Sequence, residues 1–322
     1  MKRVLTAAIL IPLVILALFR APLWLFTLLV LGVALLAARE YFDIAEKTGF
    51  RPMRGLGYSI TVLFFVGYAL VASQYVFAST ILSELGAVGG ALAASIIIVI
   101  VLLSPYCLLV FSIRREMLSQ ALGDAAVSFM LLPYIAIPLF LLVLAPPGNG
   151  PLFLVYLMVL VWCGDIAAYY VGRAVGRHKL APRISPGKTW EGAVASVIGA
   201  VIVGMLLFHY VNPIANGFRS AHLLQISIPS FPNKMPATRL EFSIAPMWFV
   251  ATFAVCVNIA AQLGDLVESA LKRGAGMKDS GTLLPGHGGV LDRIDALLFA
   301  LPVGLLFYAF GMSKYFDVRV LP

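Results

Sequence analysis

Polar residues recur at helical spacing in an otherwise apolar stretch near the C-terminal end of the chain. Spacings of four, three, four and three place five side chains on one stripe of a helix, namely Asn258, Gln262, Asp265, Ser269 and Lys272. Hydrogen bonding between helices would explain Asn258 and Gln262 alone. It does not explain the charges crowded into the next two turns, which are Asp265, Glu268, Lys272 and Arg273. A charge in apolar surroundings is costly unless it is paired or hydrated, so this stripe indicates a functional site.

A glycine-rich loop follows this stripe and leads into the next apolar stretch. Glycines on both sides of His287 permit a tight turn whose backbone amides can approach a phosphate group. Asp292 and Asp295 come three residues apart on the first turn of the next predicted helix, so they point the same way. Carboxylate oxygens are ligands that Mg²⁺ prefers, with nucleotide phosphates and water completing its coordination. We predict a magnesium and phosphate site with Asp265, Asp292 and Asp295 as metal ligands, which allows a second cation.

Simpler interpretations of this loop have to be weighed. Aspartates in the first turn of a helix commonly compensate the helix dipole, and Asp292 and Asp295 taken alone would fit that role. Their combination with the polar stripe and the glycine-rich loop favours the metal site instead. His287 is predicted to donate to a phosphate or to pack in a turn, and a general base is the less favoured alternative.

A second group of polar residues lies earlier in the chain. Asp165, Tyr169 and Gly172 fall on one helical stripe, and a basic loop follows them. Residues 185–192 read SPGKTWEG and open another apolar stretch, where free amides and a lysine suit an anion. The Gly-Lys-Thr triplet is similar to the end of a P-loop, but Pro182 stands where that motif needs glycine. We predict substrate contacts here for Asp165, Ser185, Lys188, Thr189 and Glu191.

The elements that must position these residues are membrane helices. Of the 322 residues, 61% are hydrophobic and 12% are charged, whereas soluble domains carry roughly 25% charged residues. A helix needs about 20 apolar residues to cross a bilayer. Candidate stretches are residues 4–19, 22–38, 56–78, 88–111, 126–145, 151–172, 190–211, 245–270 and 294–311. We predict an all-α, polytopic integral membrane protein with nine such helices, some of them short enough to need a tilted or thinned bilayer.

The order of these stretches also suggests how the chain is organised. Residues 1–150 hold the first five predicted helices, and residues 151–322 hold the last four together with every candidate site residue. We expect the two parts to form one structural unit. The polar interruption at 212–244 is interpreted as a lid or spacer loop.

The distribution of basic residues predicts the orientation in the membrane. With the N-terminus in the cytosol, 17 of the 23 Lys and Arg residues fall in cytosolic segments, and the C-terminus lies outside. This rule alone would explain Arg173, Arg177 and Arg183, but not the 185–192 segment. Cytosolic loops facing anionic lipid headgroups explain the net charge of +8, so nucleic-acid binding is not expected. The three cysteines lie far apart and show no metal-ligand spacing.

The C-terminal motifs resemble the signature of the phosphatidate cytidylyltransferase, or CDP-diacylglycerol synthase, family. The matching residues are Ser269, Lys272-Arg273, Lys278-Asp279, Pro285-Gly286-His287-Gly288-Gly289, Asp292-Arg293 and Asp295. Residues 165–173, 185–192 and 264–269 are also similar to that family, whereas the first five helices match in hydropathy alone. The resemblance implies CTP and phosphatidate as substrates, Mg²⁺ as cofactor and often a homodimer. The lack of an evident transit segment favours a bacterial inner membrane.

The resemblance and the residue chemistry lead to a hypothesis for the reaction. A phosphatidate oxygen attacks the α-phosphorus of CTP, Mg²⁺ on Asp265 and Asp292 polarises phosphoryl oxygens, and pyrophosphate leaves. The predicted catalytic residues are Asp265, Lys272, Arg273, Asp292 and Arg293. Further substrate contacts are predicted for Glu268, Ser269, Lys278, Asp279, His287, Gly288 and Gly289. The alternatives are a CTP-dependent polyprenol kinase, which would transfer the γ-phosphoryl group, and a membrane transporter.

Overall fold

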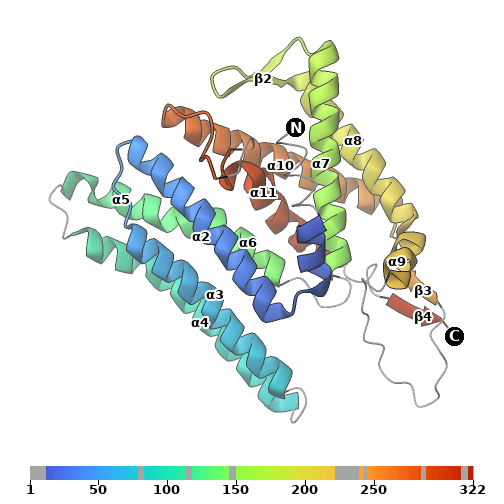
Figure 1. Cartoon of the computed structure of the whole chain (residues 1–322), viewed down its shortest axis with the longest axis horizontal. Helices are drawn as coiled ribbons and strands as arrows, with labels where there is room; N and C mark the ends of the chain where they lie inside the picture. Colours follow the sequence, from blue (N-terminus) through green and yellow to red (C-terminus); the bar gives the residue numbers. More distant parts are fainter. Residues whose placement is uncertain are drawn as a thin grey trace. The chain divides into compact units, whose positions relative to one another are not determined.

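Helices account for nearly all of the described structure, as Figure 1 shows. The computed structural model describes residues 12–78, 83–113, 118–144, 150–221, 239–242, 245–283, 288–312 and 318–321. Within them, six helices are long and apolar enough to cross a membrane: Leu23–Lys47, Leu118–Val143, Gly150–Val175, Trp190–His209, Met247–Gly274 and Leu291–Gly311. The chain is therefore an integral membrane protein, and the predicted all-α polytopic class is confirmed. The count of nine spans stays a prediction.

The predicted apolar stretches from residue 22 onward all coincide with helices. After a helical segment at residues 12–20, the chain forms α2 (Leu23–Lys47), α3 (Arg54–Ala78), α4 (Ser83–Ser112), α5 (Leu118–Leu131) and the π-helical turn η1 (Leu132–Ala136). They are followed by α6 (Ile137–Val143), α7 (Gly150–Val175), α8 (Trp190–His209), α10 (Met247–Gly274) and α11 (Leu291–Phe307), which ends in the π-helical turn η2 (Tyr308–Met312). Of the first predicted span, residues 12–19 are helical and residues 4–11 lie outside the described part of the chain.

Helix α2 runs well past the end predicted for it at residue 38. Apolar side chains continue on its buried face through Tyr41, Phe42 and Ile44, so packing sustains the helix beyond the purely apolar run. It ends where Gly49 adopts a φ of 94°, a backbone conformation that favours glycine. The extension places Glu40 inside the helix rather than in a cytosolic loop.

The chain divides into two compact units, each discontinuous in sequence. Residues 22–143 and 271–293 form one, called here the loop unit because it contains the glycine-rich loop. Residues 1–21, 144–270 and 294–322 form the other, called here the hairpin unit after a β-hairpin between α7 and α8. Helices α10 and α11 each contribute residues to both units. The predicted division of the chain at residue 150 stays a prediction.

Aromatic packing forms the core of the loop unit. Phe140 of α6 meets Phe64 and Phe65 of α3 in edge-to-face contacts with ring centroids 4.7 and 5.4 Å apart. Phe42 of α2 meets Tyr58 of α3 in the same way. Such pairs stabilise by about 0.5–1.5 kcal/mol beyond the area they bury. They hold α2, which carries Glu40, against α3.

In the hairpin unit, polar side chains join α8 and α10 inside the apolar region, and α7 packs closely against them. Asn258 of α10 is buried and donates to Ser196 of α8 at 3.1 Å, and Gln262 donates to Asn258 at 2.7 Å. A Cβ at Gly164 of α7 would overlap the Asn258 amide, so glycine lets α7 approach. Interhelical hydrogen bonding is thus the role of Asn258 and Gln262, the simpler of the two interpretations considered for them. The network fixes the helices that carry Asp165 and Asp265.

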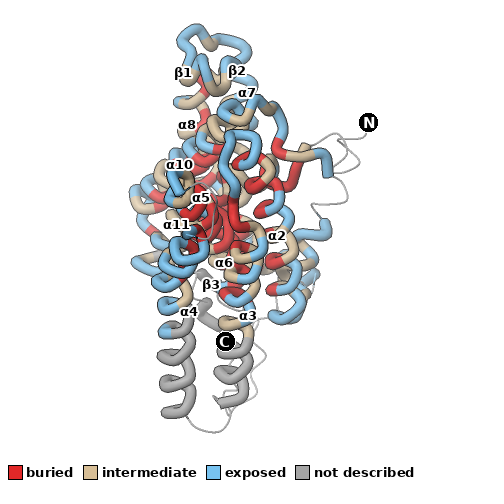
Figure 2. Tube along the Cα trace, turned by 90° about the vertical axis from the view of Figure 1, so that its left-hand side faces the viewer, coloured by how far each residue is buried: buried red, intermediate tan, exposed pale blue. Residues whose placement is uncertain are grey.

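The outer surface of α8 is a stripe of exposed apolar side chains at every fourth residue. These are Trp190, Val194, Ile198, Ile202 and Leu206, each more than half exposed. Figure 2 shows the exposed and buried segments of α8. Large apolar side chains on one helical face fit contact with lipid tails, consistent with a membrane span.

Strands form only two small sheets in the described residues. β1 (Lys179–Ala181) pairs antiparallel with β2 (Ser185–Thr189), and β3 (Arg239–Phe242) pairs antiparallel with β4 (Val318–Leu321). The interruption interpreted as a spacer loop begins with α9 (Val211–Ser220), a short amphipathic helix. Residues 222–238, 243 and 244 of that interruption lie outside the described part of the chain.

Candidate active site

The β-hairpin between α7 and α8 positions the SPGKTWEG segment. Thr189 ends β2 and caps α8, its hydroxyl accepting a hydrogen bond from the Gly192 amide at 3.2 Å. The Glu191 carboxylate lies 2.7 Å from Nδ1 of His178, just before β1, and also accepts from the His178 amide. Figure 2 shows the hairpin mostly exposed. The segment predicted as a basic loop is thus an ordered hairpin tied at its base.

Lys188 reaches from this hairpin to the polar stripe of α10. Its Nζ lies 2.5 Å from Oδ2 of Asp265, whose Oδ1 accepts from Ser269 Oγ at 3.3 Å. Asp165 of α7 interacts electrostatically with both Lys188 and Asp265. The Lys188 and Asp265 side chains are 26% and 37% exposed, so water and solutes reach the pair. The structure therefore brings together three residues that the sequence placed in two separate groups.

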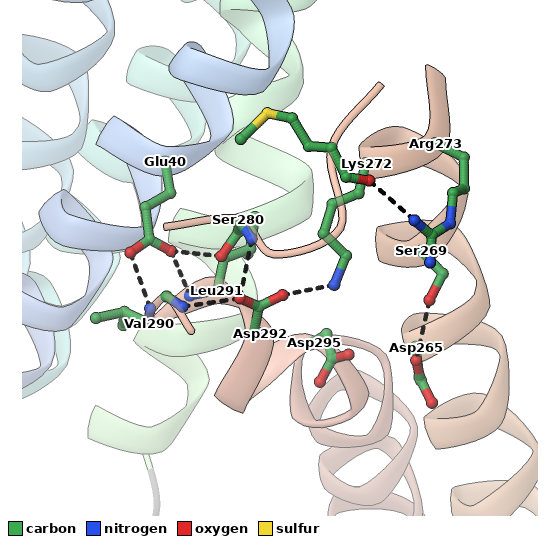
Figure 3. A network of polar contacts seen from close by, with 12 residues as sticks. Glu40, Asp265, Ser269, Lys272, Arg273, Ser280, Val290, Leu291, Asp292 and Asp295 are labelled. Atoms are coloured by element: carbon green, nitrogen blue, oxygen red, sulfur yellow. Dashed lines mark hydrogen bonds and ion pairs between the residues drawn. The ribbon is translucent and has the colours of Figure 1, made fainter. Parts of the chain in front are cut away.

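Asp295 lies beside this cluster on the neighbouring helix of the same unit. A Cβ at Gly264, next to Asp265, would overlap the Asp295 carbonyl oxygen, so α10 and α11 approach closely there. Figure 3 shows Asp265 and Asp295 on these two helices. The Asp295 Oδ1 accepts from the Ala296 amide at 2.8 Å. The hairpin unit thus brings the carboxylates of Asp165 and Asp265 to the Lys188 ammonium group, with Asp295 on the neighbouring helix.

In the loop unit, Asp292 is the centre of a second, buried cluster. Its Oδ1 lies 2.5 Å from Lys272 Nζ, and its Oδ2 accepts from the amides of Ser280 at 2.9 Å and Gly289 at 2.8 Å. The side chains of Lys272 and Asp292 are 12% and 5% exposed. Gly288, with a φ of 81°, makes the turn that lets the chain close on Asp292. Both oxygens of Asp292 thus organise the loop, as Figure 3 shows.

The remaining predicted residues differ in how exposed their side chains are, and therefore in whether a ligand can reach them. Arg273, Lys278, Asp279 and Arg293 are exposed, and Arg273 donates to the Met277 carbonyl oxygen at 3.2 Å. Ser185 in β2 is half-buried. Glu268 of α10 is fully buried, so a substrate could contact it only if the side chains that cover it moved. His287 lies outside the described residues, as do residues 284–286.

A compact metal centre is not evident among the side chains that the structure describes. No group of three or more His, Cys, Asp or Glu in those residues lies close enough together to hold a metal ion. The magnesium site predicted from Asp265, Asp292 and Asp295 therefore stays a prediction. What the structure shows instead is that Asp265 and Asp292 each hold a lysine.

The sequence matches the cytidylyltransferase family over residues 1–311, which is nearly the whole chain. The chain belongs to the cytidylyltransferase family. The family resemblance carried by the C-terminal motifs is thereby confirmed. The match also covers the first five predicted helices, which contain none of those motifs.

Individual relatives in this family carry a more specific name. A phosphatidate cytidylyltransferase of Haemophilus influenzae is 42% identical over 164 residues, which are 51% of this chain and 48% of that protein. One of Staphylococcus saprophyticus is 36% identical over 180 residues, 56% of this chain and 57% of that protein. One of Brucella suis is 42% identical over 158 residues, 49% of this chain and 46% of that protein. The chain thus spans about half the length of these curated relatives.

Sequence analysis missed one residue, Glu40, that contacts the glycine-rich loop of this cytidylyltransferase-family chain. Glu40 of α2 accepts hydrogen bonds from the loop, although it lies far from every motif along the chain. A signal for it was present, because Glu40 falls among Ala37, Tyr41 and Ile44 on the apolar face of a helix. A carboxylate at such a position needs a partner elsewhere in the fold.

Proposed function

We propose that this protein is a phosphatidate cytidylyltransferase that converts CTP and phosphatidate to CDP-diacylglycerol and pyrophosphate. Membership of the cytidylyltransferase family and relatives carrying that name support the proposal. So does the contact between Lys188 and Asp265, with which Asp165 also interacts. The proposal treats the protein as a nucleotidyltransferase of phospholipid synthesis.

The observation that carries the proposal is the accessible ion pair between Lys188 and Asp265. Lys188 suits a phosphate group and Asp265 suits a cation, and without a ligand each neutralises the other at 2.5 Å. A nucleotide triphosphate bound with its cation supplies both partners at once, so the pair can separate without leaving either charge uncompensated. Partial exposure makes that exchange inexpensive, because exposed ion pairs contribute only about 0–1 kcal/mol.

We propose Mg²⁺ as the cation that accompanies CTP. The donor chemistry fits, because carboxylates interact around one ammonium group, Lys188, whose charge a metal ion could replace. Asp265 and Asp165 of the hairpin unit would hold it together with phosphate oxygens of the nucleotide and water, while the predicted ligand Asp292 already serves Lys272 and two amides. When bound, the ion neutralises charge on the phosphoryl oxygens of the transferred group.

The chain's own cations then do most of the binding. Lys188 in the hairpin unit is proposed to neutralise phosphate oxygens of the nucleotide, and the exposed side chains of Arg273, Lys278 and Arg293 in the loop unit offer further cations for phosphate groups. A phosphatidate oxygen forms a bond to the α-phosphorus of CTP as the bond from that phosphorus to the bridging oxygen breaks, releasing pyrophosphate. The phosphate monoester is already ionised at neutral pH, so the reaction needs no general base.

The test is conversion by the purified protein in detergent, with CTP labelled in parallel at its α- or its γ-phosphate. We expect label in the lipid product from α-labelled CTP alone. Label from γ-labelled CTP alone would instead show a lipid kinase. The absence of labelled lipid from folded protein would refute both activities and leave the transporter alternative.

We also propose that the protein lies in a bacterial inner membrane with its N-terminus and hairpin in the cytosol and its C-terminus outside. The excess of Lys and Arg in the predicted cytosolic segments supports this. In a variant with Cys107, Cys163 and Cys256 replaced by alanine, we expect an Arg183→Cys side chain to react with an impermeant maleimide in inverted vesicles only. Ser220→Cys in α9 should show the reverse pattern. Labelling of both cysteines from the same side would refute the orientation.

The homodimer stays a prediction, which a measurement of the mass of the purified protein in detergent would test.

A further inference from the structure

Glu40 is a buried carboxylate that the proposed reaction does not use. It lies on α2 with 6% exposure, and its partners come from a segment that follows it by more than 200 residues in sequence. Its Oε1 accepts from the Val290 amide at 2.9 Å. Its Oε2 accepts from the Leu291 amide and from Ser280 Oγ, both at 2.8 Å. Figure 3 shows the carboxylate facing these three donors.

Two glycines of the loop are needed for this contact. A Cβ at Gly281 would come 2.6 Å from Glu40 Oε1, and a Cβ at Gly289 would overlap both Oε2 and Ser280. The sequence predicts that Gly289 lets the backbone approach a phosphate. The structure shows a further need for glycine here, since a larger residue would displace the Glu40 carboxylate from its donors.

The Glu40 contacts share residues with the Asp292 cluster. Ser280 donates its hydroxyl to Glu40 and its amide to Asp292. Gly289 donates to Asp292, and the next two amides, of Val290 and Leu291, donate to Glu40. One carboxylate from α2 and one from α11 thus hold Ser280 and residues 289–291 within the loop unit.

The energetics favour a carboxylate at this position over a neutral side chain. The first amides of a helix have no partner within it, and α11 begins at Leu291. A buried carboxylate is costly unless it is hydrogen-bonded, and three donors, two of them backbone amides, satisfy this one. Removing the charge would therefore weaken several contacts that fix Asp292, whose partner is Lys272.

We propose that Glu40 is a positioning residue for nucleotidyl transfer, fixing Ser280 and residues 289–291 so that Asp292 and Lys272 are held in one arrangement. This inference rests on the proposed function. Glu40 touches neither substrate. It acts through Ser280 and the amides of Val290 and Leu291.

The test begins with Glu40→Gln, which preserves size and replaces one acceptor oxygen by an NH₂ group. Whichever way the amide turns, that group faces a backbone N–H that needs an acceptor. We expect kcat to fall about 10–100-fold, as for residues that orient a functional side chain through hydrogen bonds. KM for CTP and for phosphatidate should stay unchanged, because the loss falls on the transition state. A variant that merely lowered the amount of folded enzyme would not change kcat per folded molecule.

A second measurement does not depend on activity. Amide hydrogen exchange in a peptide covering 280–292 should be faster in Glu40→Gln, and exchange in α3 should not change. Glu46→Gln is the matched control, because Glu46 lies on the same helix, is exposed, and pairs with Arg54 instead. Ser280→Ala, which leaves the Glu40 charge in place, should lower kcat by a smaller factor. Its effect should add less than fully to that of Glu40→Gln.

The outcomes separate this inference from the proposed function. Wild-type protein that forms no CDP-diacylglycerol would refute the proposed activity, while the exchange measurement would still report on Glu40. Unchanged exchange in 280–292, or normal kcat in Glu40→Gln, would overturn the positioning role. So would a raised KM with normal kcat, which would indicate a substrate contact. If Glu40→Gln did not fold, Ser280→Ala with normal kcat and normal exchange would overturn it equally.

Discussion

Asp265→Asn lowers the turnover of CTP and phosphatidate by about 10²–10³-fold and leaves the protein folded, as expected when one preorganised electrostatic contact is removed from a site. Asparagine matches aspartate in shape and can still accept from Ser269. Its neutral amide oxygen binds a cation more weakly than a carboxylate does and leaves the charge of Lys188 uncompensated, so both interactions of Asp265 are weakened. Because the Asp265 side chain is 37% exposed, losing its ion pair should cost only about 0–1 kcal/mol of stability.

The measurement is initial velocity against Mg²⁺ concentration, alongside unfolding in detergent. Asp43→Asn is the matched control, since Asp43 is a partly exposed aspartate on α2 paired with Arg54, and its loss should leave turnover unchanged. Asp265→Asn should be partly restored by higher Mg²⁺, because a weakened site needs a higher concentration to fill. Normal turnover of Asp265→Asn at ordinary Mg²⁺ would show that Asp265 does not serve the metal.

The helices could be predicted from the sequence because the bilayer imposes a length and a composition on each of them. The boundaries were less certain where packing takes over from hydropathy. Helix α2 continues past residue 38 because Tyr41, Phe42 and Ile44 are buried against neighbouring helices, which a hydropathy count does not register. The β1–β2 hairpin gave no signal either, since Pro182, Pro186 and Gly187 break any alternating pattern.

The candidate site was predictable to the extent that helical spacing fixes it. The stripe through Asp265, Ser269 and Lys272 is a property of one helix, and the structure confirms that helix over Met247–Gly274. Contacts between distant segments were not predictable in this way. Lys188 could not be assigned to Asp265, nor Glu40 to Ser280, because each pair joins residues far apart in the chain. Helical spacing relates only residues on the same helix, so a single sequence does not show such contacts.

Burial also distinguishes the two lysine–aspartate ion pairs that the structure shows at the candidate site residues. The Lys188–Asp265 pair is accessible and can exchange its partners for a ligand. The Lys272–Asp292 pair is enclosed, and its carboxylate is also held by two amides. We therefore interpret Lys272 as a residue that stabilises the glycine-rich loop, in addition to its predicted catalytic role.

Lys272→Met tests this interpretation, and we expect it to destabilise the protein by about 3–5 kcal/mol, the usual result of removing one member of a buried ion pair. Methionine fills much of the same space but leaves the Asp292 charge buried beside an apolar side chain, where it is costly. The measurement is reversible unfolding by SDS in mixed micelles. Lys47→Met, an exposed change at the end of α2, is the control and should shift stability by no more than about 0.5 kcal/mol.

The double variant Lys272→Met, Asp292→Asn separates stability from catalysis. Asparagine carries no charge, and its oxygen can still accept from the amides of Ser280 and Gly289, so most of the lost stability should return. Turnover should not return, because the predicted catalytic charges of Lys272 and Asp292 are both absent. Recovery of activity together with stability would show that the pair serves the fold alone. A double variant no more stable than Lys272→Met would show instead that the buried charge of Asp292 is not the source of the cost.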